Sequence, residues 1–138
     1  MSLQTTRSKL EPLALTVLRV AVGIIMAVHG WGKLTHVADT IAGFGRSGLP
    51  FSTICAYLAI AGEFLGGLGL IVGLFTPLAA FGVTCVMAVA VFHVHFKNGL
   101  LASQGGFEYP LTLLCVAIYF MMRGAGPFSL DSVLRGKR

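Results

Sequence analysis

The chain has 138 residues, of which 56% are hydrophobic and only 11% are charged, and its formal net charge is +5. Soluble domains usually carry about 25% charged residues, and a domain this short needs a polar surface in water. Composition therefore excludes an ordinary soluble domain and favours a membrane protein over the alternative of a subunit buried in a large obligate complex. The basic residues are spread along the chain, which argues against a nucleic-acid partner.

Four apolar segments of membrane-spanning length follow one another along the chain. About 20 helical residues cross the hydrocarbon core of a bilayer, so four spans use nearly the whole sequence. The predicted spans are residues 13–32, 53–74, 78–96 and 107–122. The sequence therefore predicts an all-α fold, an integral membrane four-helix bundle that forms a single domain over residues 1–138.

The first span has a competing interpretation as a cleaved signal peptide, because Arg7 and Lys9 precede it. Its apolar stretch is long for that role, Arg19 interrupts it, and no small-x-small cleavage site follows. We therefore interpret this segment as a membrane helix.

Basic residues outside the spans predict the orientation. Four spans place both termini on one side, together with the turn between the second and third spans. That side carries six basic residues, Arg7, Lys9, Arg123, Arg135, Lys137 and Arg138. The other side carries three, Lys33, Arg46 and Lys97. Because cytoplasmic segments are enriched in Lys and Arg, we expect the N- and C-termini in the cytoplasm.

Two shorter helices are expected outside the spans. Val37, Ile41 and Phe44 recur at helical spacing between the first and second spans, which predicts a short amphipathic helix at the outer interface. After the fourth span, "GAGPFSLDSVL" reads as a loop followed by a short helix that Ser129 caps.

The second span is rich in glycine. Gly62 and Gly66 are four residues apart, as are Gly69 and Gly73. This spacing allows two helix backbones to approach closely, so it indicates tight helix packing without identifying the partner helix.

Ionisable residues within the spans are candidate functional residues, because a charge inside a bilayer is costly and usually faces the bundle interior with a partner. Successive helical residues turn by 100°, which places Arg19, His29 and Lys33 within one arc of the first span. Arg19 and Glu63 lie at similar predicted depths. We therefore expect an internal Arg19–Glu63 ion pair, either as part of the site or as a structural lock between two helices.

A second group of ionisable residues lies in the stretch "FHVHFKNGLLASQGGFEYP". We expect this stretch to form an outer hairpin that holds His93 and Glu108 against His29 and Lys33. Residues i and i+2 point to opposite sides of a helix, so His95 is expected at the headgroup level and outside the site. The predicted site is a wet pocket that opens to the outer face.

Five residues are the catalytic candidates: His29, Lys33, Glu63, His93 and Glu108. The histidines would relay protons, the carboxylates would hold a partner charge, and the lysine would stabilise a developing oxyanion. A metal site is disfavoured, because His93-x-His95 cannot close a chelate on a regular helix and no H-E-x-x-H pattern is present. A haem would need an axial histidine deep in the bundle, and this is less favoured still.

Four motifs, in this order, resemble the DoxX family of small bacterial membrane proteins. They are "LRVAVGIIMAVHGWGKL", "GEFLGGLGLIVGLFTPLAA", "FHVHFKNG" with "GGFEYP", and "GAGPFSLD", and together they cover Leu18 to Asp131. The resemblance implies a multi-pass, four-helix protein of the bacterial inner membrane. The polar positions that recur in the family correspond here to Arg19, His29, Gly30, Lys33, Glu63, His93 and Glu108.

The resemblance also implies an oxidoreductase association, since the relatives that give the family its name look like the small subunit of an archaeal thiosulfate:quinone oxidoreductase. The chain would then be an oxidoreductase, or a membrane subunit of a redox complex, that handles a quinone or another small redox-active molecule in the polar pocket. The sequence has no cofactor motif or C-x-x-C pair, so the quinone or a redox partner subunit would carry the electrons. The alternative is a non-catalytic assembly subunit or small-solute binding protein. Transport, which would require a homo-oligomer, ranks last.

Overall fold

The computed structural model describes residues 3–136, and every secondary-structure element in this range is helical. The elements are α1 (Leu3–Thr35), α2 (Val37–Arg46), α3 (Ser52–Ile60), the π-helical η1 (Ala61–Leu65), α4 (Gly66–Val72), α5 (Thr76–Val89), the π-helical η2 (Ala90–His95), the short 3-10 turns η3 (Phe96–Asn98) and η4 (Ala102–Gln104), α6 (Glu108–Arg123) and α7 (Leu130–Arg135). The predicted all-α fold is confirmed.

Three continuous helical segments are long and apolar enough to cross a membrane. They are Thr6–Thr35 in α1, Ser52–Val72 across α3, η1 and α4, and Thr76–Asn98 across α5, η2 and η3. α6 has 16 residues, or about 24 Å of helix, which is shorter than the roughly 30 Å hydrocarbon core of a bilayer. The fourth membrane crossing therefore stays a prediction.

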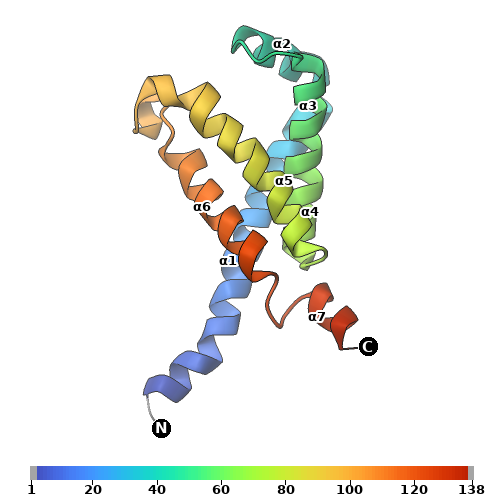
Figure 1. The fold of residues 1–138 in the computed structure, drawn as a ribbon, viewed down its shortest axis with the longest axis vertical. Coiled ribbons are helices and arrows are strands. Elements are labelled where there is room, and N and C mark those ends of the chain that lie inside the picture. The colour runs from blue at the N-terminus through green and yellow to red at the C-terminus, as the bar shows by residue number, and fades with distance from the viewer. Residues whose placement is uncertain (1–2, 137–138) are drawn as a thin grey trace.

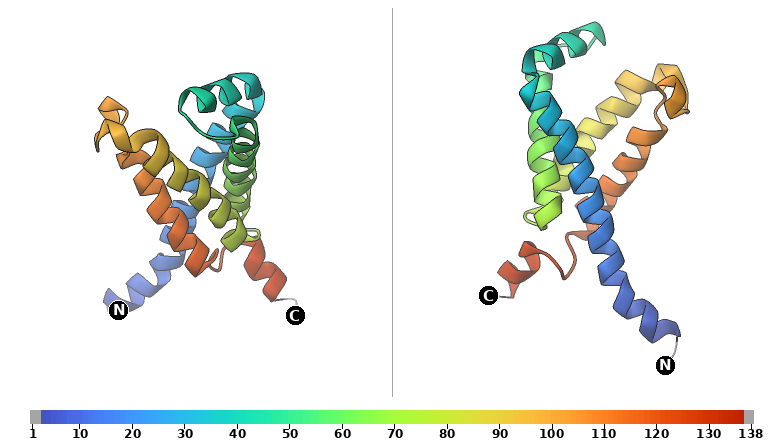
Figure 2. Two further views of the ribbon diagram at one scale, coloured as in Figure 1. Left: turned by 45° about the horizontal axis from the view of Figure 1, so that its top comes forward. Right: turned by 180° about the vertical axis from the view of Figure 1, so that it is seen from behind.

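The helices form two pairs that diverge toward one end of the molecule. α1 packs along the α3–α4 segment, and α5 packs along α6 (Figure 1). The pairs lie close together where α4 turns into α5, and they separate toward α2 and the loop that precedes α6 (Figure 2). Both ends of the chain and α7 lie at the opposite end of the molecule from α2 (Figure 1).

Glycines set the register of the antiparallel pair formed by α1 and the α3–α4 segment. A Cβ atom on Gly23 would lie 2.8 Å from the carbonyl oxygen of Gly67, and a Cβ atom on Gly30 would overlap the backbone of Phe64. Only glycine permits such contacts, so the two helices cannot slide past one another without a clash. The middle of α1 is thereby held beside the C-terminal end of α4, and the C-terminal part of α1 is held beside η1.

Glycines also bring η1 and α4 close to α5. A Cβ atom on Gly62 would lie 2.9 Å from the carbonyl oxygen of Gly82, and one on Gly66 would lie 2.9 Å from that of Ala79. The close helix packing predicted from the glycine spacing is confirmed for Gly62, Gly66 and Gly69, whose partner is α5, whereas Gly73 meets Arg19 and Ser129.

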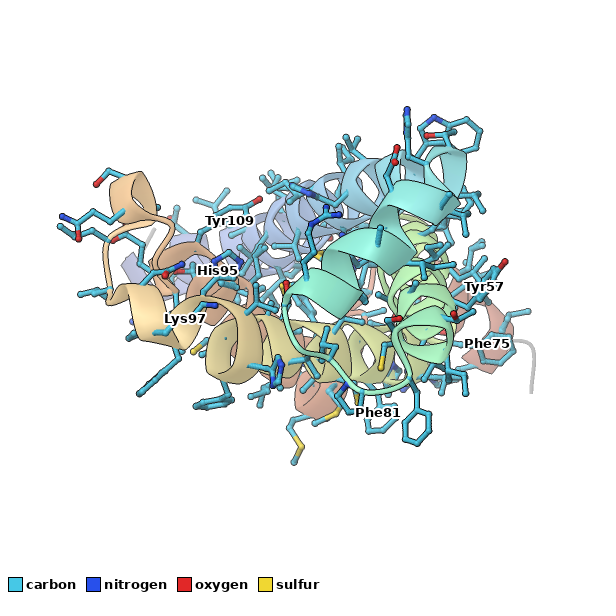
Figure 3. All side chains as sticks on the ribbon, turned by 90° about the horizontal axis from the view of Figure 1, so that it is seen from above. Tyr57, Phe75, Phe81, His95, Lys97 and Tyr109 are labelled. Carbon is cyan, nitrogen blue, oxygen red and sulfur yellow. The ribbon has the colours of Figure 1, made fainter. Side chains whose placement is uncertain are left out.

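The buried core lies between the helix pairs, while most other large apolar side chains face outward. Its main members are Val22, Met26, Leu70, Val83, Met87, Val91, Leu113, Leu114 and Phe120. Tyr57, Phe75 and Phe81 project away from the bundle (Figure 3). An apolar outer surface of this kind is suited to contact with lipid.

Both predicted short helices are present. α2 is the amphipathic helix expected between the first two spans, and none of its residues is buried. α7 begins after Ser129, whose Oγ accepts a hydrogen bond from the backbone N–H of Ser132 at 3.2 Å. The predicted cap is confirmed.

Arg19 fastens the C-terminal segment to the bundle. Its Nη1 donates to the carbonyl oxygens of Leu70, at 2.6 Å, and Ile71, at 3.2 Å. Its Nη2 donates to the carbonyl oxygen of Phe128 at 2.7 Å. The guanidinium group therefore joins the C-terminal end of α4, where helix carbonyls lack helical partners, to the segment that precedes α7.

Asp131 makes a second attachment between the C-terminal segment and the bundle. Its carboxylate accepts hydrogen bonds from two backbone N–H groups at the start of α5, those of the N-cap Phe75 (2.8 Å) and of the first helical residue Thr76 (2.9 Å). Its own N–H donates to the carbonyl oxygen of Gly73 at 2.9 Å. Partial burial raises the pKa of Asp131, but these hydrogen bonds and the charge of Arg135 outweigh burial and hold that pKa below its usual value.

Candidate functional site

A cavity of about 330 Å³ lies between α1, the two π-helical segments and the start of α6. Five side chains with polar atoms line it: His29 and Lys33 from α1, Glu63 from η1, His95 from η2 and Tyr109 from α6. The remaining lining is apolar or glycine: Met26, Met87, Ala90, Ala102, Gly105, Gly106, Pro110 and Leu113. Segments that are far apart in the sequence therefore bring their ionisable groups to one half-open pocket.

Glu63 is paired with Lys33. The Nζ atom of Lys33 lies 2.5 Å from Oε2 of Glu63, and the two side chains are 25% and 4% exposed, respectively. The predicted Arg19–Glu63 ion pair is wrong, because Arg19 donates to backbone carbonyls at the far end of α4. The glycine register explains the difference, since it places Lys33 beside η1 and keeps Arg19 near the α4–α5 turn.

The cavity's carboxylate, Glu63, and one of its two imidazoles, His95, belong to π-helical segments. Glu63 lies in the middle of η1 and His95 ends η2. A π segment replaces the i→i+4 spacing with i→i+5 and so changes the direction of the side chains that follow it; such segments often occur at functional sites. Sequence reasoning that assumed 100° per residue did not include this change.

The two histidines of "FHVHF" separate as predicted, but the one in the cavity is His95. Nδ1 of His95 lies 2.7 Å from the carbonyl oxygen of Gly105, which also accepts from Asn98 at 3.0 Å. His93 does not line the cavity, and its Nε2 lies 3.1 Å from the carbonyl oxygen of Ser47 in the loop after α2. Figure 3 shows His95 near Tyr109, viewed from above.

Glu108 also lies outside the cavity. Its Oε1 accepts a hydrogen bond from the backbone N–H of Ala102 at 2.6 Å, and its own N–H donates to the carbonyl oxygen of Leu100 at 2.9 Å. These bonds close the loop that precedes α6. The expectation that the hairpin holds His93 and Glu108 against His29 and Lys33 is therefore wrong.

Besides His95, which was expected outside the site, Tyr109 is a cavity residue that the sequence did not reveal. It follows Glu108 directly at the start of α6, and its ring centroid lies 6.3 Å from that of His29. Neighbouring residues of a helix differ by 100° in direction. Because the side chain of Glu108 points into the loop and bonds Ala102, the side chain of Tyr109 points in a different direction, toward the cavity. A tyrosine in the motif "GGFEYP" is the only signal available, and an interfacial tyrosine is common in membrane helices.

The cavity can hydrogen-bond a polar organic group and exchange protons with it. Lys33 offers N–H donors beyond the one that Glu63 accepts, and neutral imidazoles both donate and accept. Within residues 3–136, no three His, Cys, Asp or Glu side chains gather as metal ligands would.

These features define a small helical membrane protein whose ionisable groups are gathered in an interior cavity. The family model described as DoxX matches residues 14–96. The chain belongs to the DoxX family, as its motifs predicted, and is a multi-pass protein of the bacterial inner membrane.

Three similar proteins illustrate the relationship. The chain is 33% identical over 128 residues to an "Uncharacterized protein" of Haemophilus influenzae, covering 90% of this chain and 92% of the relative. It is 33% identical over 122 residues to "Putative oxidoreductase CatD" of Bacillus subtilis, covering 88% and 87%. It is 31% identical over 132 residues to "Inner membrane protein YqjF" of Escherichia coli, covering 94% and 98%. No solved structure matches the chain.

Proposed function

We propose that the cavity binds the head group of a quinone, or of a similar small redox-active carbonyl compound, and that the protein is an oxidoreductase component of the inner membrane. One observation carries the proposal: the Lys33–Glu63 pair, two histidines and a tyrosine from four helical elements line a single cavity of about 330 Å³. Ionisable residues within membrane helices that face a common interior space mark functional sites. The name of the Bacillus subtilis relative, "Putative oxidoreductase CatD", agrees with this class of reaction.

The residues have distinct roles in the proposed site. The Lys33 ammonium donates to a carbonyl oxygen of the ring and stabilises the negative charge that develops there on reduction. Glu63 holds the ammonium group in place through the 2.5 Å contact. His29 and His95 deliver protons to the two ring oxygens, as imidazoles do near neutral pH.

A partner subunit supplies the electrons for the proposed reduction of the quinone. Reduction of a quinone to a quinol takes up two electrons and two protons. The cavity residues supply only the protons, because none of them carries electrons. The electrons come from a redox partner subunit that holds a flavin or an iron–sulfur cluster.

The topology proposed for this function has four spans, with α6 as the fourth, within a single domain over residues 1–138. Two observations support it: both chain ends lie at one end of the molecule (Figure 1), and the sequence predicts six basic residues for the side of the termini against three for the other. The excess of basic residues favours cytoplasmic termini. The mouth of the cavity then lies toward the outer leaflet.

Binding of a short-chain benzoquinone to purified protein in lipid nanodiscs tests the proposal. Glu63→Gln and His29→Ala each remove a cavity group, and we expect either change to weaken binding about tenfold or more. His93→Ala is the matched control, because His93 is exposed and lies outside the cavity. We expect it to bind within about twofold of the unmodified protein. Equal binding by all four proteins would contradict the proposal.

The rate of quinone reduction distinguishes an oxidoreductase component from a non-catalytic protein. Membranes that contain the partner subunit should reduce the quinone, and Glu63→Gln should lower the rate. Quinone binding without any such dependence of the rate would favour a non-catalytic assembly subunit or a small-solute binding protein.

A further inference from the structure

A second hollow runs along the outside of α3–α4 and α5. Its volume is about 1090 Å³, and its lining is almost entirely apolar, with Leu58, Leu65, Leu68, Phe81, Val86 and Val89 among its members. Its lining also includes the glycines that bring η1 and α4 close to α5, namely Gly62, Gly66 and Gly82. We call this hollow the furrow. Both of its walls belong to membrane-spanning segments, so the furrow is open to lipid.

The furrow and the cavity meet at one place. Four residues line both hollows: Lys33, Glu63, Ala90 and His95. Glu63 belongs to η1, and Ala90 and His95 are the first and last residues of η2, so the two π-helical segments flank this junction. The Lys, Glu and His side chains of the furrow are confined to the junction, while the rest of its lining is apolar, glycine or cysteine.

We infer that the furrow holds the hydrocarbon tail of a membrane-dissolved amphiphile whose carbonyl head group occupies the cavity. The inference rests on the proposed function and narrows its substrate to a long-chain quinone that enters sideways from the bilayer. A tail loses little on moving from lipid into an equally apolar furrow, and the head group gains hydrogen bonds at the junction. The two hollows are continuous through Lys33 and Glu63, and this continuity favours an amphiphile over a second protein copy. A second copy would cover the apolar part of the furrow but would have no need of the polar groups at the junction.

Two tryptophan substitutions test the furrow. Val89→Trp places a large side chain in the furrow close to the junction; Val89 is 43% exposed and lines the furrow but not the cavity. Ile118→Trp on α6 is the matched control, because Ile118 is 41% exposed and lines neither hollow. Both changes replace a β-branched side chain on a lipid-facing surface with the same large one.

The ligands are a benzoquinone ring with a ten-carbon chain and the same ring without the chain. Binding is measured in nanodiscs, with the amount taken up by empty nanodiscs subtracted. We expect Val89→Trp to weaken binding of the chain-bearing quinone by about tenfold. Binding of the chainless ring should stay within about twofold, which also shows that the variant is folded. Ile118→Trp should bind both ligands as the unmodified protein does.

A photoreactive group at the end of the ten-carbon chain gives an independent measurement on the unmodified protein. We expect cross-links to peptides of α3, α4 or α5 and none to α6. Cross-links distributed over all helices would overturn the inference.

The remaining outcomes separate this inference from the proposed function. If the chainless ring binds in a manner that depends on Glu63, but Val89→Trp binds the chain-bearing quinone normally, the furrow inference fails and the proposed function stands. If neither quinone binds, both fail. If Val89→Trp converts a dimer to a monomer in light scattering, a second copy occupies the furrow and the inference is overturned.

Discussion

Lys33 and Glu63 are joined across α1 and η1 by an ion pair of 2.5 Å at the border between the cavity and the furrow. The pair is asymmetric, because the Glu63 side chain is 4% exposed and that of Lys33 is 25% exposed. A buried charge that loses its partner is strongly destabilising, whereas a partly exposed lysine can turn its ammonium group toward water. The two halves of the pair should therefore respond differently to substitution.

Lys33→Met should destabilise the protein more than Glu63→Gln does. Removal of the lysine leaves a buried carboxylate unpaired, which we expect to lower the free energy of unfolding by about 3 kcal/mol. The glutamine variant keeps a hydrogen-bonding group and should lose about 1 kcal/mol. Unfolding in mild detergent measures both, and the double variant should lose less than the sum of the two single changes. A strictly additive double variant would show that the pair carries no coupling.

Gly23→Ala should destabilise the bundle by about 1–3 kcal/mol. Its new Cβ would lie 2.8 Å from the backbone of Gly67 and Ile71, so α1 and α4 would have to move apart. Gly32→Ala on the same helix is the control, because its Cβ meets no atom within 4 Å. That variant should be as stable as the unmodified protein or slightly more stable, since alanine favours the helix. Similar melting temperatures for the two variants would refute the register argument.

Arg19→Lys should release the C-terminal segment even though the charge is kept. A guanidinium group reaches Leu70 and Phe128 at once through two nitrogens, whereas an ammonium group is a single point. We expect a loss of about 2 kcal/mol in unfolding free energy and faster tryptic cleavage at Arg135. Arg123→Lys, at the exposed end of α6, is the control and should change neither. Unchanged cleavage in Arg19→Lys would mean that the C-terminal segment is held without Arg19.

Asp131→Asn should remove part of the acid sensitivity of the protein. Because the pKa of Asp131 is lowered on folding, its contribution is fully present above the unfolded pKa and is lost as pH falls through the lowered folded pKa. The melting temperature of the unmodified protein should therefore fall between neutral pH and about pH 3 more steeply than that of the variant. At neutral pH the variant should be about 1 kcal/mol less stable, because its amide oxygen can accept from only one of the Phe75 and Thr76 N–H groups. If the melting temperatures of the two proteins fell in parallel with pH, Asp131 would not contribute to the acid sensitivity.

Glu108→Ala should lower stability and leave head-group binding within about twofold. Its carboxylate accepts from Ala102 and closes the loop before α6, so its loss should reduce the free energy of unfolding by about 1 kcal/mol. Quinone titration and thermal unfolding of the same preparation measure the two effects. A large loss of quinone binding at unchanged stability would show that Glu108 takes part in head-group binding, which would contradict this prediction.

Much of the fold was predictable because its determinants are local. Runs of apolar residues define the long helices, since crossing a bilayer takes about 20 of them. The period of Val37, Ile41 and Phe44 located α2, and Ser129 located the start of α7. The glycine spacing indicated close packing. Each of these signals is contained within a few turns of one segment.

The candidate site was predicted only in part, because a site depends on how segments meet. His29, Lys33 and Glu63 were identified from the rarity of ionisable groups in apolar helices, and the structure brings all three to the cavity. His93 and Glu108 were identified by the same criterion and lie elsewhere. The criterion detects unusual residues but contains no information on their direction.

The sequence by itself determined which segments are helical, which of them suit a membrane, and that a few ionisable groups would have to turn away from lipid. Only the tertiary structure decided that Glu63 meets Lys33 rather than Arg19, and that His95 rather than His93 faces the cavity. The physical reason is that backbone contacts at Gly23 and Gly30 set the height of one helix against another, and two π-helical segments rotate the residues that they contain. Neither effect is encoded in the spacing of residues within a single helix.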